Sequence, residues 1–187
     1  MGFVAILQNI ATLSDVDIAQ LRSITEEIDV AKNEIIIDSE RISPYIYLLK
    51  EGCCRIYYHK EDKEVVLGFS FPGEVIISLN SYIHRQAGYE VVDCLEPSIL
   101  YRIHAEKLKD LYQHSHAIAN WGRRLAELET IKIEERLLQT LFKTAAEKYA
   151  DLLAKHPSII QKVKLGYIAS YLGVSQVTLS RIRGDIK

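Results

Sequence analysis

A short helical segment near the C-terminus carries the residues of this sequence best suited to binding another molecule through specific side-chain contacts. Gln176, Val177, Ser180 and Arg181 stand at positions i, i+1, i+4 and i+5, which places them on one side of a helix. An arginine fork can bind guanine O6 and N7, a glutamine amide can bind adenine N6 and N7, and valine can contact a thymine methyl group. This face therefore predicts contacts with base edges in the major groove of double-stranded DNA, with Arg181 as the main reading residue.

The flanking residues predict the two helices and the turn that would position this face. Ala169 is small where a second helix would cross the first, Gly173 stands where the turn needs a positive φ, and Ser175 can cap the second helix. We expect a recognition helix over residues 175–183. The apolar seam between the two helices would consist of Ile168, Leu172, Val174, Leu179 and Ile182.

Polar residues around the recognition helix are expected to contact phosphates. Ser175, Thr178 and Lys164 would fix the register of the protein on DNA in this way. The chain has a net charge of −2, but residues 162–187 hold five basic residues and one acidic residue, which leaves −6 for residues 1–161. A helical hairpin that binds nothing would explain the apolar seam equally well. It would not explain a polar, basic second helix in an otherwise acidic chain, so we expect DNA binding.

The first half of the chain has a different pattern. Short runs rich in β-branched and aromatic residues alternate with turn formers between about residues 24 and 103, which predicts an antiparallel β-domain. The predicted strands are 34–37, 45–49, 55–58, 65–69, 89–92 and 99–101. Residues 14–21 read as a short helix with Ser14 as its N-cap. The domain boundaries predicted from these patterns are 1–112 for a sensor domain, 113–135 for a linking helix and hinge, and 136–187 for the DNA-binding domain.

The linking helix carries an apolar stripe. Ile118, Trp121, Leu125 and Leu128 recur at spacings of 3, 4 and 3. The stripe could pack on its own β-domain, as most amphipathic helices do. Its place between two domains instead favours pairing with a second copy of the chain, so these four residues are the predicted dimer interface. The hinge is expected near residues 133–136.

Other kinds of chemistry find little support in the sequence. Cys53, Cys54 and Cys94 have no CxxC spacing, so we expect reduced thiols and no metal site. No nucleophile–base constellation or phosphate-binding glycine loop is visible, so we expect no enzymatic activity and no catalytic residues. No apolar run approaches the roughly 18–20 residues that a bilayer crossing needs. The first residues, 1–5, lack a basic segment and a cleavage site, so we expect a cytoplasmic protein without a membrane partner.

Taken in order, these parts resemble the Crp–Fnr family of transcriptional regulators. The resemblance covers nearly the whole chain and is most specific in its last forty or so residues, above all in His156-Pro157, 168–173 and 178–183, which look like the short members common in Bacteroidetes. It implies an α+β fold: an N-terminal antiparallel β-roll similar to cyclic nucleotide-binding domains, a long dimerisation helix and a C-terminal helix-turn-helix domain. It also implies a homodimer on double-stranded DNA and, for an activator, RNA polymerase as a partner. Val177 departs from the Glu that the family usually carries there, so the family's usual operator is not expected.

The resemblance also points to an effector site. In the family a Gly-Glu pair opens a phosphate-binding cassette that an Arg and a hydroxyl residue close; here Gly73 and Glu74 match the opening, and Arg85 and Gln86 resemble the close. However, Gln86 replaces the hydroxyl residue, and counting back from the next strand puts Gly88 at the position of the Arg. A buried phosphate without a positioned cation is poorly stabilised. We therefore expect that the cassette has lost its ligand, and we assign the protein no cofactor with certainty. The alternatives are a cyclic-nucleotide sensor whose DNA binding is secondary or lost, and an enzyme or scaffold that borrows the β-domain.

Overall fold

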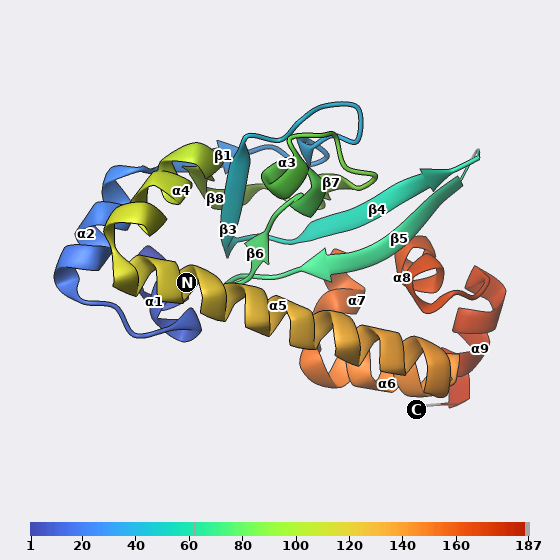
Figure 1. Cartoon of the computed structure of the whole chain (residues 1–187). Helices are drawn as coiled ribbons and strands as arrows, with labels where there is room; N and C mark the ends of the chain where they lie inside the picture. The colour runs from blue at the N-terminus through green and yellow to red at the C-terminus, as the bar shows by residue number, and fades with distance from the viewer. Residues whose placement is uncertain (62, 186–187) are drawn as a thin grey trace.

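The computed structural model describes residues 1–61 and 63–185 and has an α+β architecture (Figure 1). Lys187, one of the five basic residues counted near the C-terminus, lies outside the described residues. The strands are β1 (Thr25–Val30), β2 (Ile35–Ile37), β3 (Tyr45–Glu51), β4 (Cys54–Lys60), β5 (Lys63–Ser70), β6 (Val75–Ile76), β7 (Val91–Cys94) and β8 (Ser98–His104). The helices are α1 (Phe3–Ile10), α2 (Asp15–Ser23), α3 (Leu79–His84), α4 (Ala105–His114), α5 (His116–Phe142), α6 (Ala145–Lys155), α7 (Ile159–Lys162), α8 (Leu165–Leu172) and α9 (Gln176–Asp185).

The eight strands form two four-stranded antiparallel sheets, in the orders β1-β8-β3-β6 and β2-β7-β4-β5. Leu49, Leu100, Cys54 and Val92, which come from both sheets, are buried together in the core of this domain. The six predicted strands are all present, although the strand predicted at 89–92 lies at 91–94; β1 and β6 were not predicted. In the second sheet β5 lies at an edge, so one side of its backbone has no strand partner.

A long helix, α5, runs from the N-terminal helices to the C-terminal ones (Figure 1). Its first half packs into the core of its own domain: Ile118 and Trp121 are fully buried, Leu125 is 9% exposed, and Leu128 packs against the same cluster. The indole Nε1 of Trp121 donates a hydrogen bond to the backbone oxygen of Leu7 in α1, at 3.1 Å. Ile118, Trp121 and Leu125, three of the four residues of the predicted dimer interface, are therefore already buried within their own chain, and Leu128 is partly buried.

The second half of α5 is exposed and apolar. Ile131, Ile133, Leu137, Leu138, Leu141 and Phe142 are between 47% and 77% exposed. The helix continues without a break through 133–136, where the sequence predicted a hinge, and it ends at Phe142. The break comes instead at Lys143 and at Thr144, whose side chain caps α6 in a reciprocal capping box with Glu147.

The helices α6 to α9 share a small core of their own. Its buried members are Tyr149, Leu152, Ile159, Val163, Ile168, Ala169, Leu172 and Leu179, and Cys53 and Leu95 of the β-domain join them. The C-terminal helices thus pack directly on the β-domain. None of the described helices is long and apolar enough to cross a membrane.

Candidate DNA-binding surface and its neighbours

The helix-turn-helix predicted from the sequence is present as α8 and α9. Gly173 ends α8 with φ +73°, and no atom lies within 4 Å of the place where a Cβ would stand. The glycine is therefore needed for its backbone conformation and not for space. Ser175 Oγ accepts a hydrogen bond from Thr178 N–H at 3.1 Å and so caps α9, as predicted. The small residue Ala169 is buried, with its backbone oxygen bonded to Val174 N–H at 3.0 Å.

The structure leaves all the predicted DNA-contacting residues exposed. Leu179 is fully buried against α8, whereas the candidate contacts Lys164, Ser175, Gln176, Val177, Thr178, Ser180 and Arg181 are all exposed. Val177 is 64% exposed, which is high for an apolar side chain. Within the described part of the chain, neither Lys164 nor Arg181 takes part in an ion pair. Both cations are therefore available for a phosphate or a base.

Gln176 has a close neighbour in α8 that its sequence position does not suggest. A Cβ built on Gly166, near the start of α8, would stand 2.5 Å from Gln176 Nε2. The absence of a side chain at position 166 therefore lets the Gln176 amide lie against the first helix. A glycine at this place in the pattern was a signal for such a close approach.

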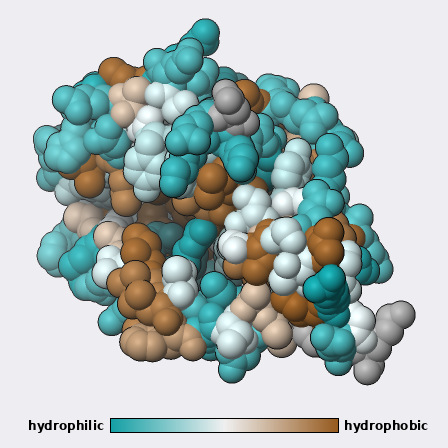
Figure 2. Space-filling view, turned by 90° about the vertical axis from the view of Figure 1, so that its right-hand side faces the viewer, coloured by the Kyte–Doolittle hydropathy of each residue, from teal (hydrophilic) through white to brown (hydrophobic). Residues whose placement is uncertain are grey.

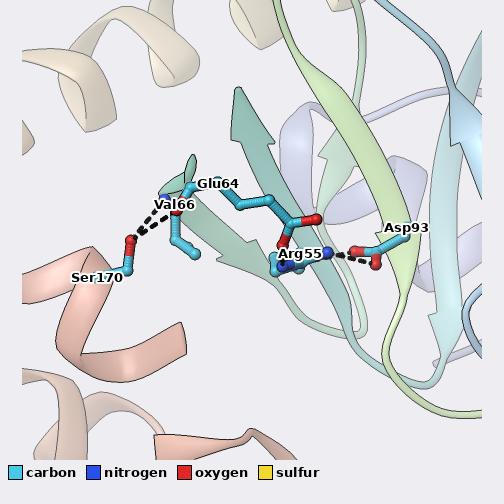
Figure 3. Close-up of polar contacts among 5 residues, drawn as sticks. All are labelled: Arg55, Glu64, Val66, Asp93 and Ser170. Carbon is cyan, nitrogen blue, oxygen red and sulfur yellow. Dashed lines mark hydrogen bonds and ion pairs between the residues drawn. The ribbon is translucent and has the colours of Figure 1, made fainter. Parts of the chain in front are cut away.

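The first helix of this pair is attached to the edge of the β-domain (Figure 3). Val66 N–H in β5 donates to Ser170 Oγ at 3.0 Å, and the Ser170 hydroxyl donates to the backbone oxygen of Glu64 at 3.4 Å. A serine side chain thus satisfies backbone groups of an edge strand, where a further strand would otherwise pair. Beside it, Tyr171 lies against Phe69, with ring centroids 5.6 Å apart.

A buried arginine underlies this contact (Figure 3). Arg55 in β4 is 3% exposed and binds Asp93 with two hydrogen bonds, of 3.0 Å from Nε and 2.8 Å from Nη2, while Nη1 binds Glu64. Its guanidinium lies between the rings of Tyr57, at 3.9 Å, and Tyr167 of α8, at 4.0 Å. Burial opposes the charge, but the hydrogen bonds to Asp93 and Glu64 outweigh it and raise the pKa of Arg55. The arginine therefore links the β-domain to the helix-turn-helix.

The residues of the predicted effector cassette make contacts within their own chain. Gly73 adopts φ +101°, and Glu74 Oε2 accepts a hydrogen bond from Phe71 N–H at 3.0 Å. Arg85 ends α3 with φ +57° and forms a 2.5 Å ion pair with Glu106 of α4, with its side chain 62% exposed. The cation that the resemblance assigned to the effector is therefore engaged elsewhere.

The remaining cassette positions are also occupied by contacts within the domain. The Gln86 backbone oxygen accepts a hydrogen bond from the Ser81 hydroxyl at 3.1 Å. A Cβ on Gly88 would stand 2.6 Å from both the Ser78 hydroxyl and the Glu90 carboxylate. These side chains take up the space into which a cassette arginine at position 88 would extend. Among the described residues of the predicted cassette, the one cation is therefore Arg85, which is paired with Glu106.

The three cysteines are fully buried. Burial raises the pKa of Cys53 to about 12. The Cys54 and Cys94 sulfurs lie 3.7 Å apart on paired strands, and this hydrogen bond together with burial raises the pKa of Cys54. Among the described residues, no group of three or more His, Cys, Asp or Glu side chains is arranged to hold a metal ion.

Comparisons with known proteins agree with the fold described above. Residues 27–115 match the family model of the cyclic nucleotide-binding domain. The structure is similar to FixK2 from Bradyrhizobium japonicum, with a TM-score of 0.75 and 19% identity over 87% of this chain and 84% of that chain. The chain has the fold of Crp/Fnr-family regulators.

Two further solved structures share this Crp/Fnr fold. CLP from Xanthomonas campestris, described as a c-di-GMP-responsive global regulator, has a TM-score of 0.73 and 16% identity, over 92% of this chain and 91% of that one. A crp/fnr-family protein from Eubacterium rectale has a TM-score of 0.69 and 20% identity, over 91% and 82% of the two chains. No curated protein sequence matches this chain. At these identities the likeness establishes the fold.

Proposed function

We propose that this protein is a DNA-binding transcriptional regulator that acts as a homodimer, with α9 in the major groove. The observation that carries the proposal is the exposed face of α9, where Gln176, Val177, Ser180 and Arg181 lie together without a covering element. Arg181 is the proposed base-reading residue. Lys164, Ser175 and Thr178 are the proposed phosphate contacts. The structural domains in this proposal are the β-domain, the helix α5 and the C-terminal helices from α6 onward.

The proposed dimer forms through the second half of α5. Exposed apolar residues on a helix favour burial against a partner, and Ile131, Leu138 and Leu141 offer such a surface. A two-fold axis beside α5 would present two copies of α9 to one face of DNA. Half-sites would then lie about 34 Å apart, one turn of B-DNA, and the operator would be a near-palindrome.

The experiment is a binding-site selection from random duplex DNA at two salt concentrations. Arg181→Ala should weaken binding to the selected site and flatten the preference at one base position in each half-site, because a bidentate contact contributes about 1–3 kcal/mol of discrimination. Lys164→Ala should weaken all sequences alike and reduce the salt slope by about one for each phosphate that the protein no longer neutralises. Arg41→Ala is the control, since Arg41 is an exposed arginine of the β-domain.

The selection has clear outcomes. A selected near-palindrome that Arg41→Ala binds as well as the wild type supports the proposal. If no sequence is enriched, the proposal that this protein binds DNA sequence-specifically is wrong. If Arg181→Ala keeps the wild-type preference at every position, Arg181 is not the reading residue.

A further inference from the structure

Cys54 and Cys94 lie directly opposite each other in the second sheet. Their Cα atoms are partners in the antiparallel pairing of β4 with β7, and their sulfurs are 3.7 Å apart. The backbone N–H of Cys94 donates to the Glu34 oxygen at 3.0 Å, and its C=O accepts from the Asn33 N–H at 2.7 Å. Both groups therefore point away from β4, which makes Cys54 and Cys94 a non-hydrogen-bonded pair with Cα atoms about 4.5 Å apart. A disulfide needs about 4.4–6.8 Å, so the backbone already has a suitable spacing.

The two thiols of this pair differ in how easily they ionise. The hydrogen bond from the Cys54 thiol lowers the pKa of Cys94, whereas the same bond and burial raise the pKa of Cys54. The thiolate is the form of cysteine that attacks an electrophile, so Cys94 is the nucleophile of the pair. Cys54 lies where it can resolve the product. The Cys53 thiol donates instead to a backbone oxygen, at 4.0 Å, and burial raises its pKa to about 12.

The edge of the sheet beside Cys94 is formed by β2 and the residues just before it. This edge strand has three residues, its pairing with β7 shifts register between Ile35 and Ile37, and Ile35 is 50% exposed. Segments with few buried contacts open locally at a lower free-energy cost than the interior of a sheet. Hydrogen peroxide is neutral and close to water in size, so local opening of β2 admits it to Cys94.

We propose that Cys54 and Cys94 form a reversible cross-strand disulfide when the protein meets hydrogen peroxide. The Cys94 thiolate attacks one peroxide oxygen, the O–O bond breaks, and the hydroxide that leaves takes up the proton that Cys94 released. This gives one water and a sulfenic acid on Cys94. The Cys54 sulfur then attacks the Cys94 sulfur, the S–O bond breaks, and the leaving oxygen takes the Cys54 proton to form a second water. The two electrons that the thiols lose are those that the peroxide gains.

The bond is reversible by ordinary thiol chemistry. A small dithiol attacks the disulfide, passes through a mixed disulfide, and leaves both cysteines reduced while it is itself oxidised. In a reducing compartment such a pair is reduced at rest, and disulfides there are transient and serve redox sensing. The three free thiols of the structure are the resting state of this cycle.

The pair lies between two residues of β4 that contact the C-terminal helices. Cys53 joins the buried core of those helices, and the guanidinium of Arg55 lies 4.0 Å from the Tyr167 ring of α8. A disulfide draws the Cys54 and Cys94 sulfurs from 3.7 Å to about 2.0 Å. Side-chain rotation takes up part of this movement, and the backbones of β4 and β7 take up the rest.

A shift of β4 acts on the attachment of α8. The side of the molecule seen in Figure 2 is hollowed between its upper and lower parts, so the contacts through Cys53 and Arg55 are not backed by continuous packing across that side. We expect oxidation to loosen α8 from β5. An effect on DNA affinity rests on the function proposed above, whereas formation of the disulfide does not.

The test is peptide mapping of the full-length protein after treatment with hydrogen peroxide and alkylation of the remaining thiols. Trypsin releases Cys94 in peptide 86–102 and the other two cysteines in peptide 51–55. We expect these two peptides to be linked, with fragmentation placing the bond on Cys54, and dithiothreitol to separate them. The free thiols of the protein, counted after unfolding, should fall from three to one.

Three variants separate the roles of the thiols. Cys54→Ala and Cys94→Ala should each abolish the linked peptides. Cys53→Ala is the matched control, because Cys53 is as fully buried as the other two, and it should leave the link unchanged. In Cys54→Ala the sulfenic acid on Cys94 lacks its resolving thiol, so dimedone should label Cys94 there more than in the wild type. The map of the wild type decides the bond even where a variant fails to fold.

Several results would overturn the proposal: no linked peptide at millimolar peroxide, a link through Cys53, or oxidation that dithiothreitol does not reverse. The structural consequence is measured by amide hydrogen exchange. The amides of α8 and of Val66, which bonds Ser170, should exchange several-fold faster in the oxidised wild type and at an unchanged rate in peroxide-treated Cys54→Ala. A disulfide that forms without altering DNA affinity would refute only the coupling to the proposed function.

Discussion

Replacing Arg55 with Met tests the contact that joins the β-domain to the helix-turn-helix. Arg55 is 3% exposed, and its partner Asp93 is 7% exposed. The substitution keeps much of the side-chain volume and removes the two hydrogen bonds to Asp93, the ion pair with Glu64 and the stacking against Tyr57 and Tyr167. Asp93 would then be a buried carboxylate without a cation.

The size of the expected loss in the free energy of unfolding follows from this unpaired buried carboxylate. Breaking a buried ion pair from one side destabilises a protein by about 3–5 kcal/mol, which is a large share of a total stability of about 5–15 kcal/mol. We therefore expect Arg55→Met to lower the free energy of unfolding by about 3–5 kcal/mol in urea titrations followed by circular dichroism. Adding Asp93→Leu should recover at least half of this loss, because the double variant buries no unpaired charge at the pair.

The control is Arg123→Met, which removes an exposed ion pair with Glu127 on α5. An exposed pair of this kind contributes less than about 1 kcal/mol, so this variant should unfold nearly like the wild type. If Arg55→Met also costs less than about 1 kcal/mol, the pair with Asp93 does not hold this interface. If the double variant is as unstable as the sum of the single ones, the orphaned carboxylate is not the cause.

Two other predictions follow from packing and titration. Leu138 is 47% exposed and Leu125 is buried. Leu138→Asp should therefore give folded monomers in sedimentation experiments, whereas Leu125→Asp should destabilise the fold itself. A wild type that is monomeric at micromolar concentration would contradict the dimer. Burial against Phe71 lowers the pKa of His156 below 6.5, so the unfolded chain takes up the proton first and stability should fall as the pH drops below about 6.5. His156→Phe should reduce this fall between pH 7.5 and 5.5 in urea titrations, and an unchanged slope would contradict the assignment.

Local structure was predictable wherever the backbone or its hydrogen bonds limit the choice of residue. Gly173 was assigned a positive φ and Ser175 a capping role, and both are as predicted, because few residue types suit such positions. Ser14 likewise caps α2, in a capping box with Asp17. The strands were also predictable from the local sequence, because β-branched residues favour strands.

Long-range partners were not predictable in this way. The spacing of Ile118, Trp121 and Leu125 shows that one face of α5 is buried, but it does not show which segment covers it. That segment is α1, whose residues Phe3, Ile6, Leu7 and Ile10 are also buried. Their spacings of 3, 1 and 3 were a helical signal in the sequence. That signal pointed to α1 as a helix with an apolar face to bury.

The contact through Ser170 lay beyond sequence reasoning altogether. Its partners are backbone groups of Glu64 and Val66, about a hundred residues away, and any residue type offers the same backbone groups. Arg55 was missed for a related reason, since an arginine within a strand usually marks a solvent-exposed position. Its burial depends on Asp93 in the neighbouring strand and on Tyr167 in a distant helix.

The way α8 is held constrains how an effector could control this protein. The contact with the β-domain uses Tyr167, Ser170 and Tyr171 of α8, whereas the face of α9 that carries Arg181 is exposed. Contact between α8 and the β-domain therefore does not cover the proposed DNA-reading surface, and its release would not expose any of the proposed DNA contacts on α9. What docking does fix is the position of α9 relative to α5 and hence, in a dimer formed through α5, the distance between the two recognition helices. Because that distance must match about one turn of B-DNA, a ligand that shifts α8 by a few ångströms against β5 would change DNA affinity without any change in the residues that read the sequence.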